Sequence, residues 1–274
     1  AQYRVPTMLL NGRLSARAFS RYQKAQPLIQ QMLLNLSVIV VQTERIKQRF
    51  EALGASQTQL YCTHNIKYDM RVDPSQQDQG QQKRQLWGAS RPCLIAASTH
   101  PGEEIIAAKT HILLKKKINN IVTIIIPRHV ERVGEINKQI KKLNLSTFLH
   151  SSKNKLLKKI DIYIVDTFGE TKLFYRKTPT VFIGKSITAT GGQNPLEAAR
   201  YGAKILHGPH VGNFKDIYRL LKSLKISNQV GKIEQIVNNI TFKKNSNKSK
   251  KIHNFGNAIF KKKIYELNQK INDE

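Results

Sequence analysis

Short runs of aliphatic and β-branched residues alternate with helical patterns along most of this sequence. In the later part of the chain the predicted strands are 93–97, 121–126, 160–165, 180–183, 205–206 and 226–230. The helical patterns between them cover about 102–116, 131–143, 168–176, 195–202 and 214–224. Because a parallel strand can return only through a crossover, this alternation predicts βαβ units on a parallel sheet. The predicted fold class is α/β, with a doubly wound sheet in this part of the chain.

The same alternation is present in the first seventy residues. A β-branched run at 36–41 is typical of a strand buried on both faces, and an amphipathic pattern at 44–53 precedes a short strand at 59–62. A polar, glutamine-rich stretch then interrupts the alternation at 71–91. We therefore predict four parts, which are residues 1–70, a linker with an entry helix at 71–91, a domain at 92–240, and a basic loop followed by a charged helix at 241–274.

A glycine-rich segment, VFIGKSITATGGQNPLEAARYGAKILHGPHVGNF at 181–214, joins two predicted strands. Gly191 and Gly192 precede a helix start, at which Asn194 would cap the helix and Glu197 would reach back to the cap. Backbone N–H groups and the positive end of a helix predict a receiving site for an anion such as a phosphate. An ordinary strand-to-helix turn would use the same residues, and the spacing matches neither G-x-G-x-x-G nor a P-loop.

Polar residues follow three other predicted strands, as Ser98-Thr99-His100, Pro127-Arg128-His129 and Asp166 to Glu170. Ligands of open α/β sheets bind outside the carboxyl ends of the strands, so we expect these groups to lie near one another. The rigid fork of Arg128 suits a phosphate, although a surface ion pair would also use an arginine there. Together these groups predict a pocket for a nucleotide and a sugar phosphate.

The formal charge of +28, from 46 basic and 18 acidic residues, fits a nucleic acid, an anionic membrane surface or an anionic substrate. The lysines accompany many Asn and Ile, a bias that compositional drift would also produce. Aromatic residues are sparse in the basic runs, so no base-stacking platform is predicted. Neither the cysteines nor the histidines have metal-ligand spacing, and no apolar run is long enough to predict a transmembrane helix.

Five segments, in this order and spacing, resemble the 3-deoxy-D-manno-octulosonic acid (Kdo) transferases of lipopolysaccharide synthesis: AASTHPGEE, PRHVER, VDTFGE, GGQNPLE and GPHVGNF. HNIKYD, near residue 64, also looks like that family, so the likeness covers essentially the whole chain. The resemblance implies a GT-B architecture, with a complete C-terminal Rossmann-like domain for the donor and the last part of an N-terminal, acceptor-binding one. It implies CMP-Kdo as donor, a lipid A precursor as acceptor, and a place at the anionic, cytoplasmic face of the bacterial inner membrane.

The resemblance also assigns roles to single residues. It implies that Arg128 binds the CMP phosphate, and that Gly191, Gly192, Asn194 and Glu197 surround the donor phosphate and ribose. The other residues that it places in the donor pocket are Ser98, Thr99, His100, Phe168, Gly169 and Glu170. It implies that no metal is needed for transfer. No cofactor is expected, and no specific nucleic-acid partner is expected because a basic charge alone does not require Arg128 or Glu197 where they fall.

Three positions depart from the family's pattern. Gln193 stands where a His is usual, Lys185 where a second Gly is usual, and His64 where a Gly is usual. The family's membrane anchor and the glutamate expected as general base would lie upstream of Ala1, so this chain alone is expected to bind the donor without turning it over. Two alternatives remain, namely another GT-B sugar-nucleotide transferase and a non-catalytic basic fragment that binds nucleic acid or membrane.

Overall fold

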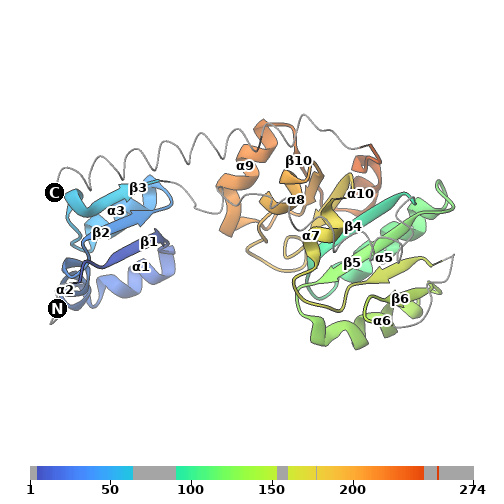
Figure 1. Cartoon of the computed structure of the whole chain (residues 1–274), viewed down its shortest axis with the longest axis horizontal. Helices are drawn as coiled ribbons and strands as arrows, with labels where there is room; N and C mark the ends of the chain where they lie inside the picture. The colour runs from blue at the N-terminus through green and yellow to red at the C-terminus, as the bar shows by residue number, and fades with distance from the viewer. Residues whose placement is uncertain (1–4, 64–90, 153–159, 177, 244–251, 253–274) are drawn as a thin grey trace. The chain divides into compact units, whose positions relative to one another are not determined.

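The structure, a computed structural model, describes residues 5–63, 91–152, 160–176, 178–243 and 252. The described residues form two compact units, unit 1 within 5–63 and unit 2 within 91–252 (Figure 1). Three predicted features lie outside the described residues: the HNIKYD segment, the linker at 71–91 except its last residue, and the charged helix near the C-terminus. Most of the predicted basic loop lies outside them as well.

Unit 1 contains a three-stranded parallel sheet in the order β1-β2-β3. Its elements are β1 (Met8–Gly12), α1 (Ala16–Gln23), α2 (Gln26–Leu34), β2 (Val38–Val41), α3 (Glu44–Ala52), η1 (Gln57–Gln59) and β3 (Leu60–Cys62). The predicted strands at 36–41 and 59–62 and the predicted helix at 44–53 are thereby confirmed. Ile39 and Val41 of the middle strand are fully buried and pack with Phe50 of α3.

Two helices of unit 1 begin at residues that cap them. The Ser15 hydroxyl accepts a hydrogen bond from the backbone N–H of Ala18 at 3.1 Å, at the start of α1. The Thr43 hydroxyl accepts one from the N–H of Ile46 at 3.3 Å, at the start of α3. Each cap satisfies an N–H group that has no partner inside the first helical turn, which fixes where the helix starts.

Unit 2 is built on a seven-stranded parallel sheet in the order β10-β9-β8-β4-β5-β7-β6. The strands are β4 (Cys93–Thr99), β5 (Val122–Pro127), β6 (Thr147–Leu149), β7 (Ile162–Ile164), β8 (Thr180–Ile183), β9 (Lys204–His207) and β10 (Ser227–Gln229). The helical elements are α5 (Glu103–Lys115), η4 (Val130–Arg132), α6 (Val133–Lys141), α7 (Thr171–Tyr175), α8 (Leu196–Arg200), η5 (Gly212–Phe214), α9 (Lys215–Ser223) and α10 (Ile233–Asn239). The α/β fold class is confirmed, and each strand predicted in this part corresponds to an observed strand.

The sequence pattern does not reveal β6 or α10. In β6, an edge strand of three residues, only Phe148 is buried, and it pairs with Tyr163 of β7. In α10, a helix of seven residues, only Ile236 is buried. An element with one buried side chain leaves no periodicity to detect, so both remain invisible until the neighbouring elements are in place.

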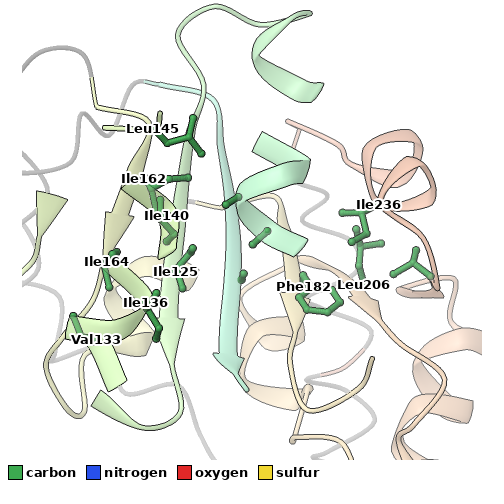
Figure 2. Close-up of a cluster of buried hydrophobic side chains, with 14 residues drawn as sticks. Ile125, Val133, Ile136, Ile140, Leu145, Ile162, Ile164, Phe182, Leu206 and Ile236 are labelled. Carbon is green, nitrogen blue, oxygen red and sulfur yellow. The ribbon is translucent and has the colours of Figure 1, made fainter. Parts of the chain in front are cut away.

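The core of unit 2 explains why its strands read as unbroken apolar runs. Figure 2 shows Ile136 and Ile140 of α6 packed against the sheet, on the side toward which Ile125 and Ile162 point. Ile124 points to the opposite face and is equally buried, because both faces of the sheet are covered. A strand covered on both faces needs apolar residues at every position rather than at alternate ones.

The strand order of unit 2 contains a switch point between β4 and β8. From β4 the chain moves outward through β5 to β6 and β7, and then returns to β8 on the other side of β4. The loops that leave the carboxyl ends of β4 and β8 therefore diverge, and in open α/β sheets ligands bind in the crevice that this leaves. The topology therefore places the candidate ligand site at the loops at 100–102 and 184–195.

A buried polar cluster lies at the opposite, amino-terminal edge of the sheet. The carboxylate of Asp161, just before β7, accepts a hydrogen bond from the Lys115 ammonium at 2.5 Å. It also accepts hydrogen bonds from the N–H and the hydroxyl of Ser146, at 3.0 and 2.9 Å. His111 of α5 lies between Asp161, at 3.3 Å, and the hydroxyl of Thr123, at 3.1 Å. These hydrogen bonds tie α5 and the loop before β6 to the starts of β5 and β7, so the cluster is a structural one.

We expect acid to remove the contribution of Asp161 to the stability of unit 2. Burial acts to raise the pKa of Asp161, but hydrogen bonds from Lys115 and Ser146 and the charge of Lys115 outweigh it and lower the pKa to about 2. Because the folded pKa lies below the usual value of 3.8, the contribution is present above about pH 4 and is lost as the pH falls through about 2. Its size at neutral pH is about 2 kcal/mol.

Urea unfolding of the wild type and of Asp161→Asn, at about pH 7 and about pH 2.5, measures this contribution. The gap in unfolding free energy between the two proteins should be wide at the higher pH and should narrow at the lower one. A gap of the same width at both pH values would contradict the assignment.

Candidate functional site

The residues predicted for the site follow the carboxyl ends of neighbouring strands, and backbone hydrogen bonds join the loops that carry them. The N–H of Arg128, after β5, donates to the carbonyl of Thr99, at the end of β4, at 3.1 Å. The N–H of Gly184, after β8, donates to the carbonyl of Ala97 in β4 at 2.8 Å. The loops after β4, β5 and β8 therefore form one continuous edge, with β4 at its centre.

The end of β4 and the loop that follows it carry three of the predicted residues, with Ser98 and Thr99 in the strand and His100 in the loop. Ser98 has a left-handed backbone, with φ of 55°, and Thr99 is fully buried. The hydroxyl of Thr99 makes no hydrogen bond within the described part of the chain. The His100 ring contacts the ring of His129 edge-on, with centroids 5.8 Å apart, so the loops after β4 and β5 also meet through side chains.

Glu103, the first residue of α5, organises this edge, and its fully buried carboxylate accepts four backbone hydrogen bonds. One oxygen accepts from the N–H groups of His100 at 3.0 Å and Lys185 at 2.7 Å. The other accepts from Ser186 at 2.9 Å and Ile187 at 3.0 Å. Several N–H donors can hold an ionised carboxylate in a buried place. The carboxylate therefore links the loops after β4 and β8.

Part of the segment predicted to receive an anion already has a partner within the protein. The backbone N–H groups of residues 185–187 donate to the carboxylate of Glu103, so these three groups are not open to a ligand. Sequence reasoning missed Glu103 as an organising residue because three of its four partners lie more than eighty positions away. The local signal was an acidic residue in the first turn of a helix, which usually indicates a favourable dipole interaction and no more.

The two arginines of PRHVER have different environments. Arg132 forms a two-pronged ion pair with the buried carboxylate of Glu104, at 3.0 and 3.5 Å. Arg128 is exposed, and its guanidinium makes no hydrogen bond or ion pair with the residues that the structure describes. Arg132 is thus part of the scaffold, whereas the fork of Arg128 is available to an oxyanion.

Gly191 and Gly192 lie in the loop after β8, both with left-handed backbones, at φ of 107° and 73°. A Cβ on Gly191 would lie 2.6 Å from the side-chain nitrogen of Asn213, and one on Gly192 would lie 2.9 Å from Cα of Val211. The left-handed backbone therefore favours glycine at both positions, and at Gly192 the nearby backbone of Val211, in the loop after β9, leaves no room for a Cβ. Their presence is explained by the scaffold, with or without a ligand.

Asn194 and Glu197 only partly follow the predicted helix start. The side-chain oxygen of Asn194 accepts a hydrogen bond from the N–H of Leu196 at 3.1 Å, and α8 begins one residue later than predicted, after Pro195. The predicted return of Glu197 to the cap is wrong for the described residues, in which its carboxylate forms a 3.9 Å ion pair with Lys172. Burial raises the pKa of Glu197, and the charges of Lys172 and Arg200 oppose that shift.

The loop after β7 carries the remaining predicted residues. Phe168 lies at its tip with 75% of its surface exposed, next to Gly169, whose φ is 81°. A side chain this apolar and this exposed, on a short loop at the carboxyl edge of the sheet, is available to pack against a flat group. The Lys172–Glu197 ion pair connects the start of α7, which follows this loop, to α8.

Glu170, also in this loop, is held by a residue that the sequence did not indicate. Both ring nitrogens of the buried His150 have polar partners. Nε2 lies 2.8 Å from the Glu170 carboxylate, and Nδ1 forms a hydrogen bond of 2.6 Å with the Tyr163 hydroxyl. The Thr167 hydroxyl donates to the same carboxylate. His150 directly follows β6, the strand that the sequence pattern does not reveal, which is why His150 was missed.

The carboxylates that follow these strands have partners among the described residues. Glu103 is engaged by backbone N–H groups, Glu104 by Arg132, Glu131 by His129, Asp166 by Ser151, Glu170 by His150 and Glu197 by Lys172. Among the described residues, no group of three or more histidine, cysteine or carboxylate side chains could hold a metal ion. None of the described helices has the length and hydropathy needed to span a membrane.

Comparison with known sequences finds the same kind of protein, a 3-deoxy-D-manno-octulosonic acid transferase, for a family profile and for full-length relatives. The sequence profile described as 3-deoxy-D-manno-octulosonic-acid transferase (kdotransferase) matches residues 1–70. A 3-deoxy-D-manno-octulosonic acid transferase of Haemophilus influenzae is 35% identical over 218 residues, which are 79% of this chain and 51% of that protein. One of Rickettsia bellii is 32% identical over 268 residues, which are 97% of this chain and 62% of that protein. The chain thus spans about half to three fifths of the length of these relatives.

Solved structures agree on the fold. The C-terminal CMP-Kdo binding domain of WaaA from Acinetobacter baumannii is 28% identical, with a TM-score of 0.54, covering 58% of this chain and 84% of that one. The trehalose-6-phosphate synthase OtsA is 11% identical, with a TM-score of 0.52, covering 97% of this chain and 67% of that one. With the parallel sheets of both units, these likenesses confirm an α/β fold of the GT-B type.

Proposed function

We propose that this chain, which belongs to the family of the 3-deoxy-D-manno-octulosonic acid transferases, serves glycosyl transfer from CMP-Kdo. Unit 2 would bind the donor at the carboxyl edge of its sheet. The domain at 92–240 would be the donor domain, and residues 1–70 would contribute to the acceptor side. The acceptor would be a lipid A precursor at the cytoplasmic face of the inner membrane.

The observation that carries the proposal is the exposed guanidinium of Arg128, which has no partner among the described residues and lies beside the switch point of the sheet. Arg128 leaves β5 next to the end of β4, where its backbone is held by Thr99. A planar fork binds two phosphate oxygens at once and stays charged at any physiological pH. There it would bind the phosphate of CMP in the donor and would also stabilise the negative charge that forms as CMP departs.

The other predicted residues would complete the pocket around the nucleotide. Glu197, whose carboxylate is held by one long ion pair with Lys172, would accept hydrogen bonds from the ribose hydroxyls. Phe168 would pack on a flat part of the donor, on a loop held in place by the pair of His150 and Glu170. No metal and no cofactor is needed in this scheme, because leaving-group charge is met by cations of the protein.

The test is calorimetric titration of the full chain with CMP. We expect Arg128→Ala to weaken CMP binding by about 10- to 100-fold, because a charge-assisted hydrogen-bond pair is lost. Arg219→Ala removes an equal charge from the exposed face of α9, where Arg219 is paired with Asp216, and should leave the affinity within about twofold. Equal affinities of the wild type and Arg128→Ala would count against a donor site at Arg128.

A further inference from the structure

Lys185 has a backbone conformation that is unfavourable for a lysine. It is the second residue after β8, and its φ is 57°, in the left-handed region that favours glycine. A residue with a Cβ is strained in this region, and such strain is retained where the surrounding structure enforces it. Lys185 therefore occupies a position at which a glycine would fit more easily, in the loop at the switch point of the sheet.

Both polar groups of the Lys185 backbone are fixed. Its N–H donates to the buried carboxylate of Glu103 at 2.7 Å, and its carbonyl accepts from the N–H of Gly192 at 2.9 Å. With the backbone held on both sides, the direction of the bond from Cα to Cβ is also fixed. The backbone hydrogen bonds therefore set the direction in which the side chain leaves the main chain.

The side chain runs along the loop after β8 that contains Gly191 and Gly192, which we call the glycine loop. Cε of Lys185 lies 3.8 Å from the position that a Cβ on Gly191 would take, so the aliphatic stem covers Gly191. The residue is half-buried, and its ammonium makes no hydrogen bond or ion pair with the described part of the chain. The nearby acid, Glu103, already accepts four backbone hydrogen bonds and does not pair with it.

A second lysine, Lys225, has the same backbone conformation as Lys185 but lies at a different edge of the sheet. Lys225, with φ of 56°, follows α9 and precedes β10, so it lies at the amino-terminal edge of the sheet. It is exposed, and its N–H closes the end of α9 on the carbonyl of Lys222 at 2.9 Å. Lys225 thus shares the residue type, the charge and the φ of Lys185, but it lies at the edge away from the candidate site.

We propose that the Lys185 ammonium binds an oxyanion of the donor together with Arg128; this inference rests on the proposed function. Arg128 leaves β5 and Lys185 leaves β8, with β4 between them, so the two strands are about 10 Å apart. Two long side chains can converge on one ligand across that span. The oxyanion is the phosphate or the sugar-acid carboxylate of CMP-Kdo, both of which suit an ammonium.

The experiment compares three ligands by calorimetry on the full chain: cytidine, CMP and CMP-Kdo. Lys185→Asn and Lys185→Gly both remove the charge, and both residues tolerate a left-handed backbone, so the fold should be kept. We expect about 5- to 10-fold weaker binding of at least one anionic ligand, no change for cytidine, and recovery in Lys185→Arg. Lys225→Asn, the matched control, should change none of the three affinities.

The outcomes distinguish a contact of Lys185 with the phosphate, a contact with the carboxylate and the absence of any contact. Weaker binding of both CMP and CMP-Kdo assigns the contact to the phosphate, and weaker binding of CMP-Kdo alone assigns it to the carboxylate. Unchanged affinities in both Lys185 variants, with CMP binding still lost in Arg128→Ala, would overturn this inference and leave the proposed function intact. A wild-type chain that binds neither nucleotide would overturn both. An equal loss in Lys225→Asn would show a general charge effect and would overturn the role of Lys185.

Discussion

Replacing Glu103 with alanine is expected to lower the unfolding free energy of unit 2 by about 4 kcal/mol or more. The change removes a buried carboxylate that accepts hydrogen bonds from four backbone N–H groups, those of His100, Lys185, Ser186 and Ile187. A buried donor left without a partner costs about 1–3 kcal/mol, and bonds to a charged acceptor are at the strong end of the range. Partial entry of water into the vacated space would reduce the sum.

Urea unfolding followed by circular dichroism measures this loss. Glu103→Gln should fall between the wild type and Glu103→Ala, because one carboxylate oxygen becomes an NH₂ group that faces backbone donors. Glu135→Ala, at an exposed position of α6, is the control and should change the free energy by no more than about 0.5 kcal/mol. A Glu103→Ala protein within about 1 kcal/mol of the wild type would contradict the role assigned to this carboxylate.

Replacing Gly208 with alanine should be similarly severe, for a steric reason. A Cβ on Gly208 would lie 2.0 Å from the carbonyl oxygen of Ser186 and 2.4 Å from its carbonyl carbon. These are backbone atoms, so no side-chain rotation relieves the overlap. The loop after β8 would have to move, and with it the hydrogen bonds that Glu103 makes to residues 185–187. We expect a loss of about 3 kcal/mol or more, which corresponds to roughly 10 °C in the melting temperature.

Gly134→Ala is the matched control for that experiment. Gly134 lies in α6, and apart from the nearby backbone of that helix no atom of the described residues lies within 4 Å of the position of its added Cβ. Alanine there should raise the unfolding free energy by about 0.5–1 kcal/mol, because it is the better helix former and restricts the unfolded chain. Thermal unfolding of the two variants should therefore move the melting temperature in opposite directions. A Gly208→Ala protein that melts with the wild type would show that the two loops are not packed as described.

Glu103 and Gly208 hold the same set of loops together. The loops after β4, β8 and β9 are joined by the Glu103 carboxylate on one side and by the close contact of Gly208 with Ser186 on the other. The N–H of Gly208 also donates to the Ser186 hydroxyl at 2.8 Å. An edge held in this way keeps Lys185 and the glycine loop in one position before any ligand arrives, and preorganisation of this kind reduces the entropy lost on binding.

The two arginines of PRHVER show what a sequence can and cannot indicate about this edge of the sheet. Arg128 could be selected because it follows a predicted strand, and its selection needs only the rule about carboxyl ends. Arg132 belongs to the same motif, and the sequence offers no means of telling which of the two is engaged by the scaffold. The partner that decides the matter is Glu104, on a different helix and buried. An ion pair between distant positions leaves no local pattern.

The sequence alone determined the layered α/β fold, because burial on both faces of a sheet forces unbroken apolar runs such as Ile124–Ile126 and separates them by helical stretches. It also placed Arg128 and the glycine loop at strand ends. Only the tertiary structure decided that Glu103 takes the loop N–H groups, that His150 holds Glu170, and that Lys185 has a left-handed backbone. The physical reason is that periodicity reports burial along one element, whereas these features depend on hydrogen bonds and contacts between groups that meet only when different elements pack.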